Sequence, residues 1–160
     1  MSTGLSGFLD GVDYPMFVVT AQHAGDHAGC LVGFATQVSI DPARFLVGLS
    51  VVNHTYDVAR DATTLAVHLL ARDQTELAAL FGSETGDEID KFARCRWHEG
   101  PHGVRVLSDV PSWMAGKILE QIPLGDHVGF LLEPREVHHG DARDMLTFEQ
   151  VKGLTPGHPA

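Results

Sequence analysis

The chain has 160 residues, of which 44% are hydrophobic and 20% charged, values typical of one soluble globular domain. Its formal net charge of −10 argues against nucleic acid and anionic membranes as partners, because both repel an acidic surface. No apolar run approaches the roughly 20 residues that cross a bilayer.

The first predicted elements are a short helical turn over residues 6–9 and an apolar strand over residues 16–20. Residues 22–29 have the composition of a turn and join this strand to the next one as a hairpin. We expect His23 and His27 to lie in that turn, with solvated side chains.

The next segment alternates between two faces with the period of a β-strand. One face carries Phe34, Thr36, Val38 and Ile40, and the other carries Ala35, Gln37 and Ser39. Residues 41–42 predict a turn, and residues 45–49 predict a more continuously apolar strand. Short polar residues then lead into a helix, for which Thr55 fits the N-cap.

This arrangement suits a flat ligand that carries an anion. Small side chains on a strand face let a planar ring lie against the backbone, and a helix N-terminus attracts phosphate. The residues that could hold the phosphate are Ser50, Asn53, His54 and Thr55. A flavin nucleotide has this shape and charge. The alternative is a β-meander whose small face packs on another element, followed by an ordinary capped helix.

The clearest helix signal follows an apolar strand predicted over residues 65–70. Residues 73–76, DQTE, form a capping box, which marks a helix start. The helix is expected to end at Gly82. Its inward-facing residues at helical spacing are Leu77, Leu80 and Phe81.

The last third of the chain again predicts strands. Residues 117–122 and 127–133 alternate and are joined by a turn at residues 123–126, and residues 144–148 predict a final strand. Short strands separated by turns, with few helices, indicate an all-β barrel. We expect a folded domain over residues 1–150 and a loose C-terminal tail over residues 151–160.

The termini and the cysteines bear on the cellular compartment. Residues 1–11 lack the basic start and the apolar run of a secretory signal. Cys30 and Cys95 lie far apart in the sequence and outside any CxxC motif, which favours reduced or buried thiols. We therefore expect a cytoplasmic protein.

A superficial metal motif, C-x2-H-x3-H, is formed by Cys95, His98 and His102. It supplies only three ligands, and only His138 and His139 could complete the set. A solvated loop is the favoured interpretation, so we expect no metal site.

Several segments resemble the flavin reductase-like, FMN-binding split-barrel family. The segment GFATQVSIDPARFLVGLS followed by NHT is similar to the flavin-binding core of that family. The supporting segments, in the order that the family shows, are YPMFVVTA (14–21), LAVHLLARDQTELAALF (65–81), GDEIDKF (86–92) and GDHVGFLLE (125–133).

The resemblance implies a fold, an activity and partners. The fold would be an all-β split barrel of Greek-key type with a few short helices, forming a homodimer with flavins near the subunit interface. The activity would be hydride transfer from NADH or NADPH to FMN, with FAD as the alternative flavin. The reduced flavin would be used in place or passed to a partner monooxygenase.

The resemblance also implies site residues. The isoalloxazine ring would be lined by Phe34, Ala35, Thr36, Gln37, Val38 and Ser39, and the phosphate would be held by Ser50, Asn53, His54 and Thr55. His127 would be catalytic, orienting the nicotinamide or stabilising negative charge on the reduced flavin. This chain departs from many relatives at Val51 and Val52, where they carry a basic residue.

Three other interpretations remain open at this point. A non-enzymatic electron carrier would bind FMN but be reduced slowly by NAD(P)H. A pyridoxamine phosphate oxidase-like enzyme or a deazaflavin-using enzyme would have the same fold. Both of these enzymes predict a more basic pocket than this acidic chain indicates.

Overall fold

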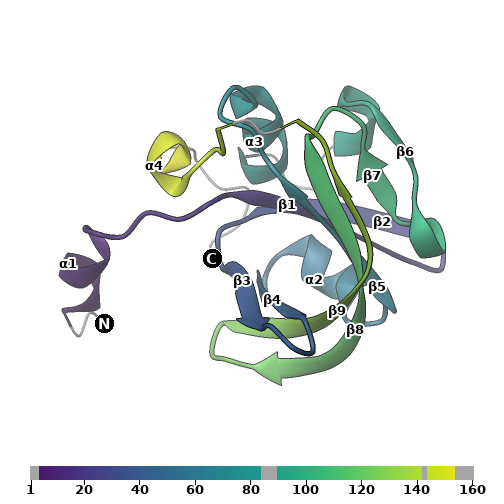
Figure 1. Ribbon diagram of the computed structural model, residues 1–160, viewed down its shortest axis with the longest axis horizontal. Coiled ribbons are helices and arrows are strands. Elements are labelled where there is room, and N and C mark those ends of the chain that lie inside the picture. Colours follow the sequence, from purple (N-terminus) through teal and green to yellow (C-terminus); the bar gives the residue numbers. More distant parts are fainter. Residues whose placement is uncertain (1–3, 84–89, 142–143, 154–160) are drawn as a thin grey trace.

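The computed structural model describes residues 4–83, 90–141 and 144–153 (Figure 1). Its strands are β1 (Phe17–His23), β2 (Asp26–Val32), β3 (Ala35–Ser39), β4 (Arg44–Ser50), β5 (Thr64–Leu69), β6 (Trp97–Glu99), β7 (Arg105–Leu107), β8 (Ser112–Pro123) and β9 (His127–His139). Its helices are α1 (Leu5–Leu9), α2 (His54–Ala59), α3 (Thr75–Ser83) and α4 (Phe148–Val151), with 3-10 turns η1 (Lys91–Arg94) and η2 (Pro101–Gly103).

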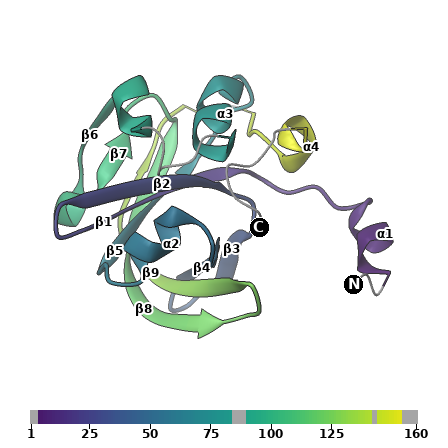
Figure 2. The same cartoon turned by 180° about the vertical axis from the view of Figure 1, so that it is seen from behind.

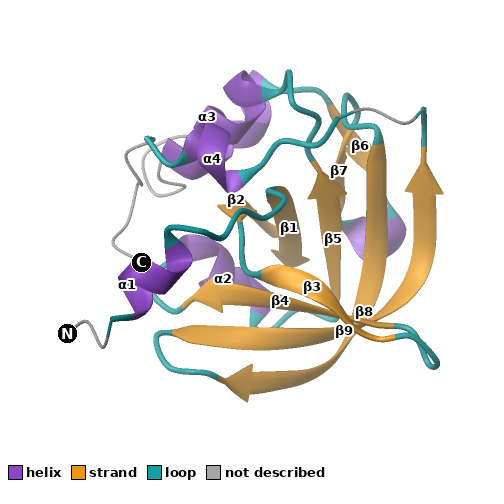
Figure 3. Ribbon diagram, turned by 60° about the vertical axis from the view of Figure 1, so that its left-hand side comes forward, coloured by secondary structure: helices purple, strands orange, loops and turns teal. Residues whose placement is uncertain are grey.

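One antiparallel sheet of seven strands, in the order β2-β1-β5-β8-β9-β4-β3, forms the body of the molecule. The long strands β8 and β9 carry bulges at Ala115/Gly116 and Ile118/Glu120, and bulges bend strands. Figure 3 shows both strands curving so that β5 pairs with one part of β8 and β4 with one part of β9. The sheet therefore folds back on itself.

The two edges of this sheet, β2 and β3, adjoin each other in the chain. Only Gly33 and Phe34 separate them, so the open edges meet at one corner. Helix α2 lies against β1 and β2 inside the fold, as the view from behind shows (Figure 2). The predicted all-β fold class with few helices is thus confirmed.

Two hydrophobic clusters cover the two faces of β1. Val19 belongs to the cluster inside the folded sheet, together with Phe130, whereas Val18 belongs to the cluster beneath α3 and α4, together with Phe81 and Leu146. All five side chains are at most 1% exposed. Burying one such side chain stabilises the fold by roughly 1.5–3 kcal/mol. Both faces of β1 are buried from Val18 to Ala21, so this part of its sequence does not alternate between apolar and polar residues. Its one polar side chain there, Thr20, donates a 2.7 Å hydrogen bond to the backbone oxygen of Arg105.

Most predicted elements are confirmed, including the helical turn near residues 6–9, the hairpin of β1 and β2, the strand at 45–49 and helix α3. The setting of His27 was predicted wrongly. It lies within β2 and is half-buried against Phe92, because the hairpin turn is only Ala24-Gly25. His23 is the exposed last residue of β1.

The strand predicted over residues 144–148 is also wrong. Among the described residues here, Met145 and Thr147 make only isolated β-bridges, and α4 begins at Phe148. The reason is a capping box in which the side chains of Thr147 and Gln150 satisfy each other's backbone. Helix α4 runs to Val151, whose side chain is buried. The division of the chain after residue 150 stays a prediction.

No helix within the described ranges is long and apolar enough to span a membrane. Helix α1 stands away from the sheet, and its aromatic residue Phe8 is 71% exposed (Figure 1). Part of the predicted motif GDEIDKF falls on residues 84–89, outside the described residues.

Candidate functional site

A cavity of about 220 Å³ lies at the corner where β2 passes into β3. Four of the predicted site residues line it, namely Phe34, Ser50, Asn53 and His127. The other lining residues are Tyr14, Met16, Cys30, Leu31, Val32, Gly33, Gly48, Leu49 and Phe148. The structure therefore gathers segments from both ends and the middle of the chain at one site.

Glycines allow the rings of this site to approach the backbone. A Cβ at Gly33 would come within 2.4 Å of the Tyr14 ring, so only glycine fits there. At Gly48 a Cβ would meet Phe34 at 3.3 Å and His127 at 3.9 Å. The rings of Phe34 and His127 lie 4.9 Å apart, tilted by 51°.

His127 is held in place by its neighbour in the chain. Its Nδ1 donates a hydrogen bond of 2.8 Å to the carboxylate of Asp126. The side chain of His127 is 17% exposed, whereas that of Asp126 is 78% exposed. Nε2 is then the ring nitrogen available to a ligand, as an acceptor when the ring is neutral and as a donor when it is protonated.

Helix α2 begins two residues earlier than the sequence predicted. The N-cap is Asn53, whose side chain accepts a 2.8 Å hydrogen bond from the backbone N–H of Thr55. The prediction of Thr55 as the N-cap is therefore wrong. Its side chain is only 1% exposed, and it hydrogen-bonds the thiol of Cys30. Burial raises the pKa of that thiol, and the Thr55 contact opposes the rise.

The predicted phosphate residues separate into two pairs. Ser50 and Asn53 line the cavity, whereas His54 and Thr55 do not. The Ser50 oxygen accepts the N–H of Val52 at 3.4 Å, which leaves its O–H able to donate. The amide nitrogen of Asn53 can donate as well. None of the described lining residues is a lysine or an arginine, so the donors here are neutral.

The predicted ring-binding strand lies mostly beside the cavity. Strand β3 is an edge of the sheet, with Thr36, Gln37 and Val38 exposed and Ala35 and Ser39 half-buried. Of this segment, only Phe34 lines the cavity. Ala35 packs against the hydrophobic cluster inside the folded sheet, which contains Val19 and Phe130. Contact of β3 with a flavin stays a prediction.

Sequence reasoning missed Tyr14, Cys30 and Phe148 as lining residues. Gly33, next to a strand end, was the one local signal for close packing by a ring. Phe148 gave no such signal, because its segment was predicted to be a strand.

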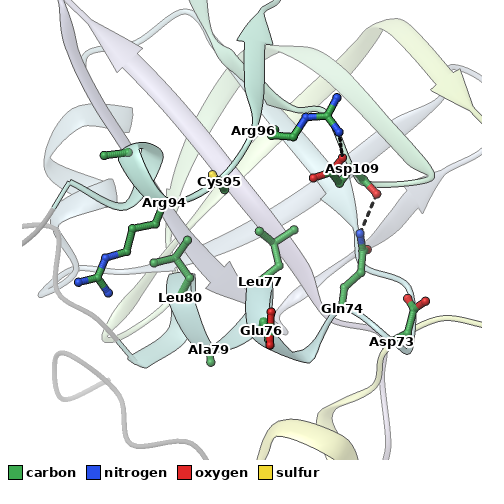
Figure 4. Close-up of a pocket in the computed structure, with 11 residues that line it drawn as sticks. Asp73, Gln74, Glu76, Leu77, Ala79, Leu80, Arg94, Cys95, Arg96 and Asp109 are labelled. Carbon is green, nitrogen blue, oxygen red and sulfur yellow. Dashed lines mark hydrogen bonds and ion pairs between the residues drawn. The ribbon is translucent and has the colours of Figure 1, made fainter.

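A second, larger cavity of about 910 Å³ lies between α3 and the segment around η1 (Figure 4). It contains none of the predicted site residues. Leu77 and Leu80 point into it from α3, and Arg96 pairs with Asp109 at 2.9 Å on its far side. Gln74 also donates to the backbone oxygen of Asp109 at 2.7 Å. This larger cavity has no aromatic ring among its described lining residues, so the smaller cavity at the β2–β3 corner suits a planar ligand better.

The residues of the superficial metal motif serve other contacts. Cys95 packs beside the hydrophobic cluster beneath α3 and α4, and His98 hydrogen-bonds Ser108 at 3.0 Å. The backbone oxygen of His102 accepts from Gln22. Within the described part of the chain, no three histidine, cysteine or acidic side chains are grouped to hold a metal ion.

A family model, sequence relatives and solved structures all point to the same protein family. The model of the flavin reductase like domain matches residues 9–154. A Pseudomonas syringae protein named FMN reductase (NADH) RutF is 24% identical over 88% of this chain and 78% of its own length. The crystal structure of a flavin reductase domain protein from Arthrobacter sp. FB24 superposes with a TM-score of 0.81 at 22% identity, covering 89% of this chain and 87% of that one.

Other relatives are longer than this chain. The stachydrine N-demethylase reductase subunit Stc3 of Rhizobium meliloti is 31% identical over 69% of this chain, and the match covers 48% of its own length. The match to another protein of the same bacterium covers 36% of that protein. The chain thus spans about half or less of these two relatives.

Proposed function

The chain belongs to the flavin reductase-like domain family, and from this premise we propose that it binds FMN and transfers a hydride to it from NADH or NADPH. The observation that carries the proposal is the cavity at the β2–β3 corner. The cavity combines aromatic rings, two glycines at which other residues pack close to the backbone, and the neutral donors of the α2 N-terminus. A planar ring with a phosphate needs these three features together.

The lining residues fit a flavin nucleotide in a specific way. Ser50 and Asn53 would donate hydrogen bonds to the phosphate. The planar ring would lie against Phe34 and the backbone at Gly33 and Gly48. A bound flavin supplies the hydride-accepting chemistry, and the protein contributes binding and orientation.

His127 would stabilise the negative charge of the reduced flavin and would not itself break a bond. Its Nε2 would donate a proton or a hydrogen bond to the negative charge that reduction places on the ring. The cavity volume is below the roughly 300–1,000 Å³ of ordinary ligand pockets. We therefore propose that only part of the flavin enters it and that the remainder lies along β3. FAD remains the alternative flavin.

The test is an anaerobic titration of the purified protein with FMN, followed by NADH and then NADPH. We expect bound flavin to bleach at a catalytic rate with one of the two donors. Flavin that binds but stays oxidised with both donors would favour an electron carrier. A protein that does not bind FMN would overturn the proposal.

The pyridoxamine phosphate oxidase-like and deazaflavin alternatives require a basic pocket. The described lining of this cavity is uncharged apart from His127 when protonated, which favours FMN reduction by NAD(P)H. Oxidation of pyridoxamine 5′-phosphate, or bleaching of FMN only by a reduced deazaflavin, would support the alternatives instead.

We also propose that two copies associate through the β3 edge. Val38 in β3 and Ile40 in the turn directly after it are 48% and 85% exposed, and apolar side chains at an unpaired strand edge are usually covered. Ile40→Lys should convert the dimer to a monomer in analytical ultracentrifugation. A wild-type monomer would overturn this part.

The recipient of the reduced flavin is proposed from the relatives. The relative Stc3 of Rhizobium meliloti is named as the reductase subunit of stachydrine N-demethylase, which motivates a partner monooxygenase for this chain. The test is whether the protein with FMN and NADH supports substrate oxidation by an oxygenase from the same genome.

A further inference from the structure

The loop that joins β4 to α2 uses its backbone donors within the protein itself. The N–H of Val51 donates to the carbonyl of Asp126 at 3.0 Å. The N–H of Val52 donates to the Ser50 hydroxyl at 3.4 Å, and the N–H of Asn53 donates to the carbonyl of Ser50 at 3.0 Å. A phosphate beside this loop would therefore find each of these three N–H groups already occupied.

The first turn of α2 is satisfied in the same way. The N–H of Thr55 donates to the side chain of Asn53 at 2.8 Å, and the N–H of Tyr56 donates to the carbonyl of Asn53 at 3.0 Å. Backbone N–H groups at the start of a helix bind phosphate where they lack such partners. Five backbone N–H groups between Val51 and Tyr56 are thus already hydrogen-bonded within the protein.

The side chains around this loop supply no net positive charge among the described residues. The exposed side chains of the loop are the apolar ones of Val51 and Val52, which are 39% and 52% exposed. Asp57 is exposed in the first turn of α2, where a carboxylate offsets the positive end of the helix dipole. His127 is charged only when protonated, and it is then paired with the Asp126 carboxylate at 2.8 Å.

Two neutral side chains are the donors left for the anionic end of a flavin, namely the hydroxyl of Ser50 and the amide nitrogen of Asn53. A phosphate dianion loses strong hydration when it leaves water, and two neutral donors replace only part of it. A neutral hydroxyl, such as the terminal one of riboflavin, can use the same two side chains at a smaller loss of hydration. The site therefore gives the phosphate little advantage over a hydroxyl.

We propose that this site holds the flavin by its ring and ribityl chain and not by its phosphate, so that riboflavin binds about as tightly as FMN and the flavin exchanges as a substrate. The substrate class is then the neutral as well as the phosphorylated flavins. The inference rests on the proposed binding of a flavin at this site and concerns the end of the flavin that carries the phosphate.

The test measures the dissociation constants of oxidised riboflavin and oxidised FMN with the wild-type protein by isothermal titration calorimetry. We expect the two constants to agree within about 5-fold. A phosphate held by cationic side chains binds more weakly as salt is added. Because this chain has a formal net charge of −10, its affinity for FMN should instead hold or rise between about 20 mM and about 300 mM NaCl.

A gain of function tests the same point in the opposite direction. Val52→Arg adds a cation beside the loop and should tighten FMN binding about 3- to 10-fold, leave riboflavin binding unchanged and make FMN binding weaker at higher salt. Val51→Arg places the charge one residue away and serves as the second variant. The matched control is Val137→Arg near the far end of β9, where the side chain is 62% exposed, and it should change neither constant. Melting temperatures identify any variant that has lost its fold.

The outcomes separate this inference from the proposed function. Wild type that binds neither flavin overturns both. Wild type that binds FMN more than about 5-fold more tightly than riboflavin overturns the inference and leaves the proposed function standing. Unchanged FMN affinity in both Val51→Arg and Val52→Arg also overturns the inference, because the phosphate would then lie away from this loop.

Discussion

His127 and Asp126 act as a pair, and this makes the role of the histidine testable. Because Nδ1 is bonded to Asp126, the proposed function depends on Nε2. His127→Ala should leave FMN affinity largely unchanged and slow flavin reduction about 10- to 100-fold, since a group that stabilises developing charge acts on the rate. Anaerobic stopped-flow bleaching of FMN measures this rate. An unchanged rate would reduce His127 to a packing residue beside Phe34.

Asn53 combines two roles that one pair of variants can separate. As the N-cap of α2 it offers an oxygen to the N–H of Thr55, and as a phosphate ligand it would offer its amide nitrogen. Asn53→Ala should lower the free energy of unfolding by about 1 kcal/mol and weaken FMN binding. Thermal melts and FMN titration measure the two effects.

Asn53→Asp is the control for that experiment. It keeps the capping oxygen but loses the amide donor and adds a negative charge, so stability should be retained while FMN affinity falls. Retained affinity in Asn53→Asp would remove Asn53 from the phosphate site.

The choice between Asn53 and Thr55 shows what residue-level reasoning cannot decide. Both residue types are good N-caps, and the sequence places them two positions apart. The cap is decided by the extended backbone at Asn53, with φ −86° and ψ 136°, and by the burial of Thr55 against Cys30. Neither the backbone conformation of Asn53 nor the burial of Thr55 can be derived from the neighbouring residues in the sequence.

At the level of elements, the turn of the β1–β2 hairpin holds a non-glycine residue in a strained backbone conformation that a substitution can relieve. Its two-residue turn has φ 51° at Ala24 and φ 86° at Gly25, both in the left-handed region. Alanine is disfavoured there, whereas Asn-Gly is the preferred pair for such a turn. Ala24→Asn should raise the free energy of unfolding by about 0.5–1 kcal/mol in denaturant titration. Ala24→Val should lower it, and equal stability of the two variants would contradict the turn geometry.

Element prediction succeeded where the local pattern and the tertiary environment agree. The strand at residues 45–49 and helix α3 carry clear turn or capping signals and are confirmed. The prediction of a strand at residues 144–148 failed because only Leu146 is fully buried there, Met145 is 46% exposed, and the backbone makes separate contacts rather than a strand ladder. Met145 pairs with Ala71 and Thr147 with Pro15 as isolated bridges.

At the level of the whole molecule, the cavity exists because distant segments meet. Tyr14 and Phe148 reach it from the two ends of the described chain, and His127 reaches it through the curvature of β9. The sequence supported the flavin interpretation through Phe34, Ser50 and Asn53, which lie near one another in the chain. It could not indicate Phe148, since the contact with Tyr14 depends on the complete fold.

His68 links three strands of the core and makes the fold sensitive to acid. Its side chain is fully buried, Nδ1 donates to the carbonyl of Val18 at 2.8 Å, and Nε2 accepts the N–H of Leu107 at 3.1 Å. Burial lowers the pKa of His68 from 6.5 to about 4. Protonation would also require Nε2 to give up its bond to Leu107.

The direction of the pH effect follows from this lowered pKa. As the pH falls below 6.5, the unfolded chain takes up a proton that the folded chain refuses until about pH 4. The stability is therefore fully present above the unfolded pKa and is lost progressively between these two values. Integrating over the shift predicts a loss of about 2 kcal/mol between pH 7.5 and pH 5.

Urea titrations at pH 7.5 and pH 5 measure this loss. His68→Gln removes the titrating ring, and the exposed His23→Gln is the matched control. The variant at position 68 will be less stable at pH 7.5 but should lose about 2 kcal/mol less than wild type on going to pH 5, whereas the control should follow wild type. Parallel losses in all three proteins would show that His68 does not take up its proton on unfolding in this range. The acid sensitivity would then have to come from other groups, and His68 would already be protonated in the folded protein at pH 5, without the bond from the Leu107 N–H to its Nε2.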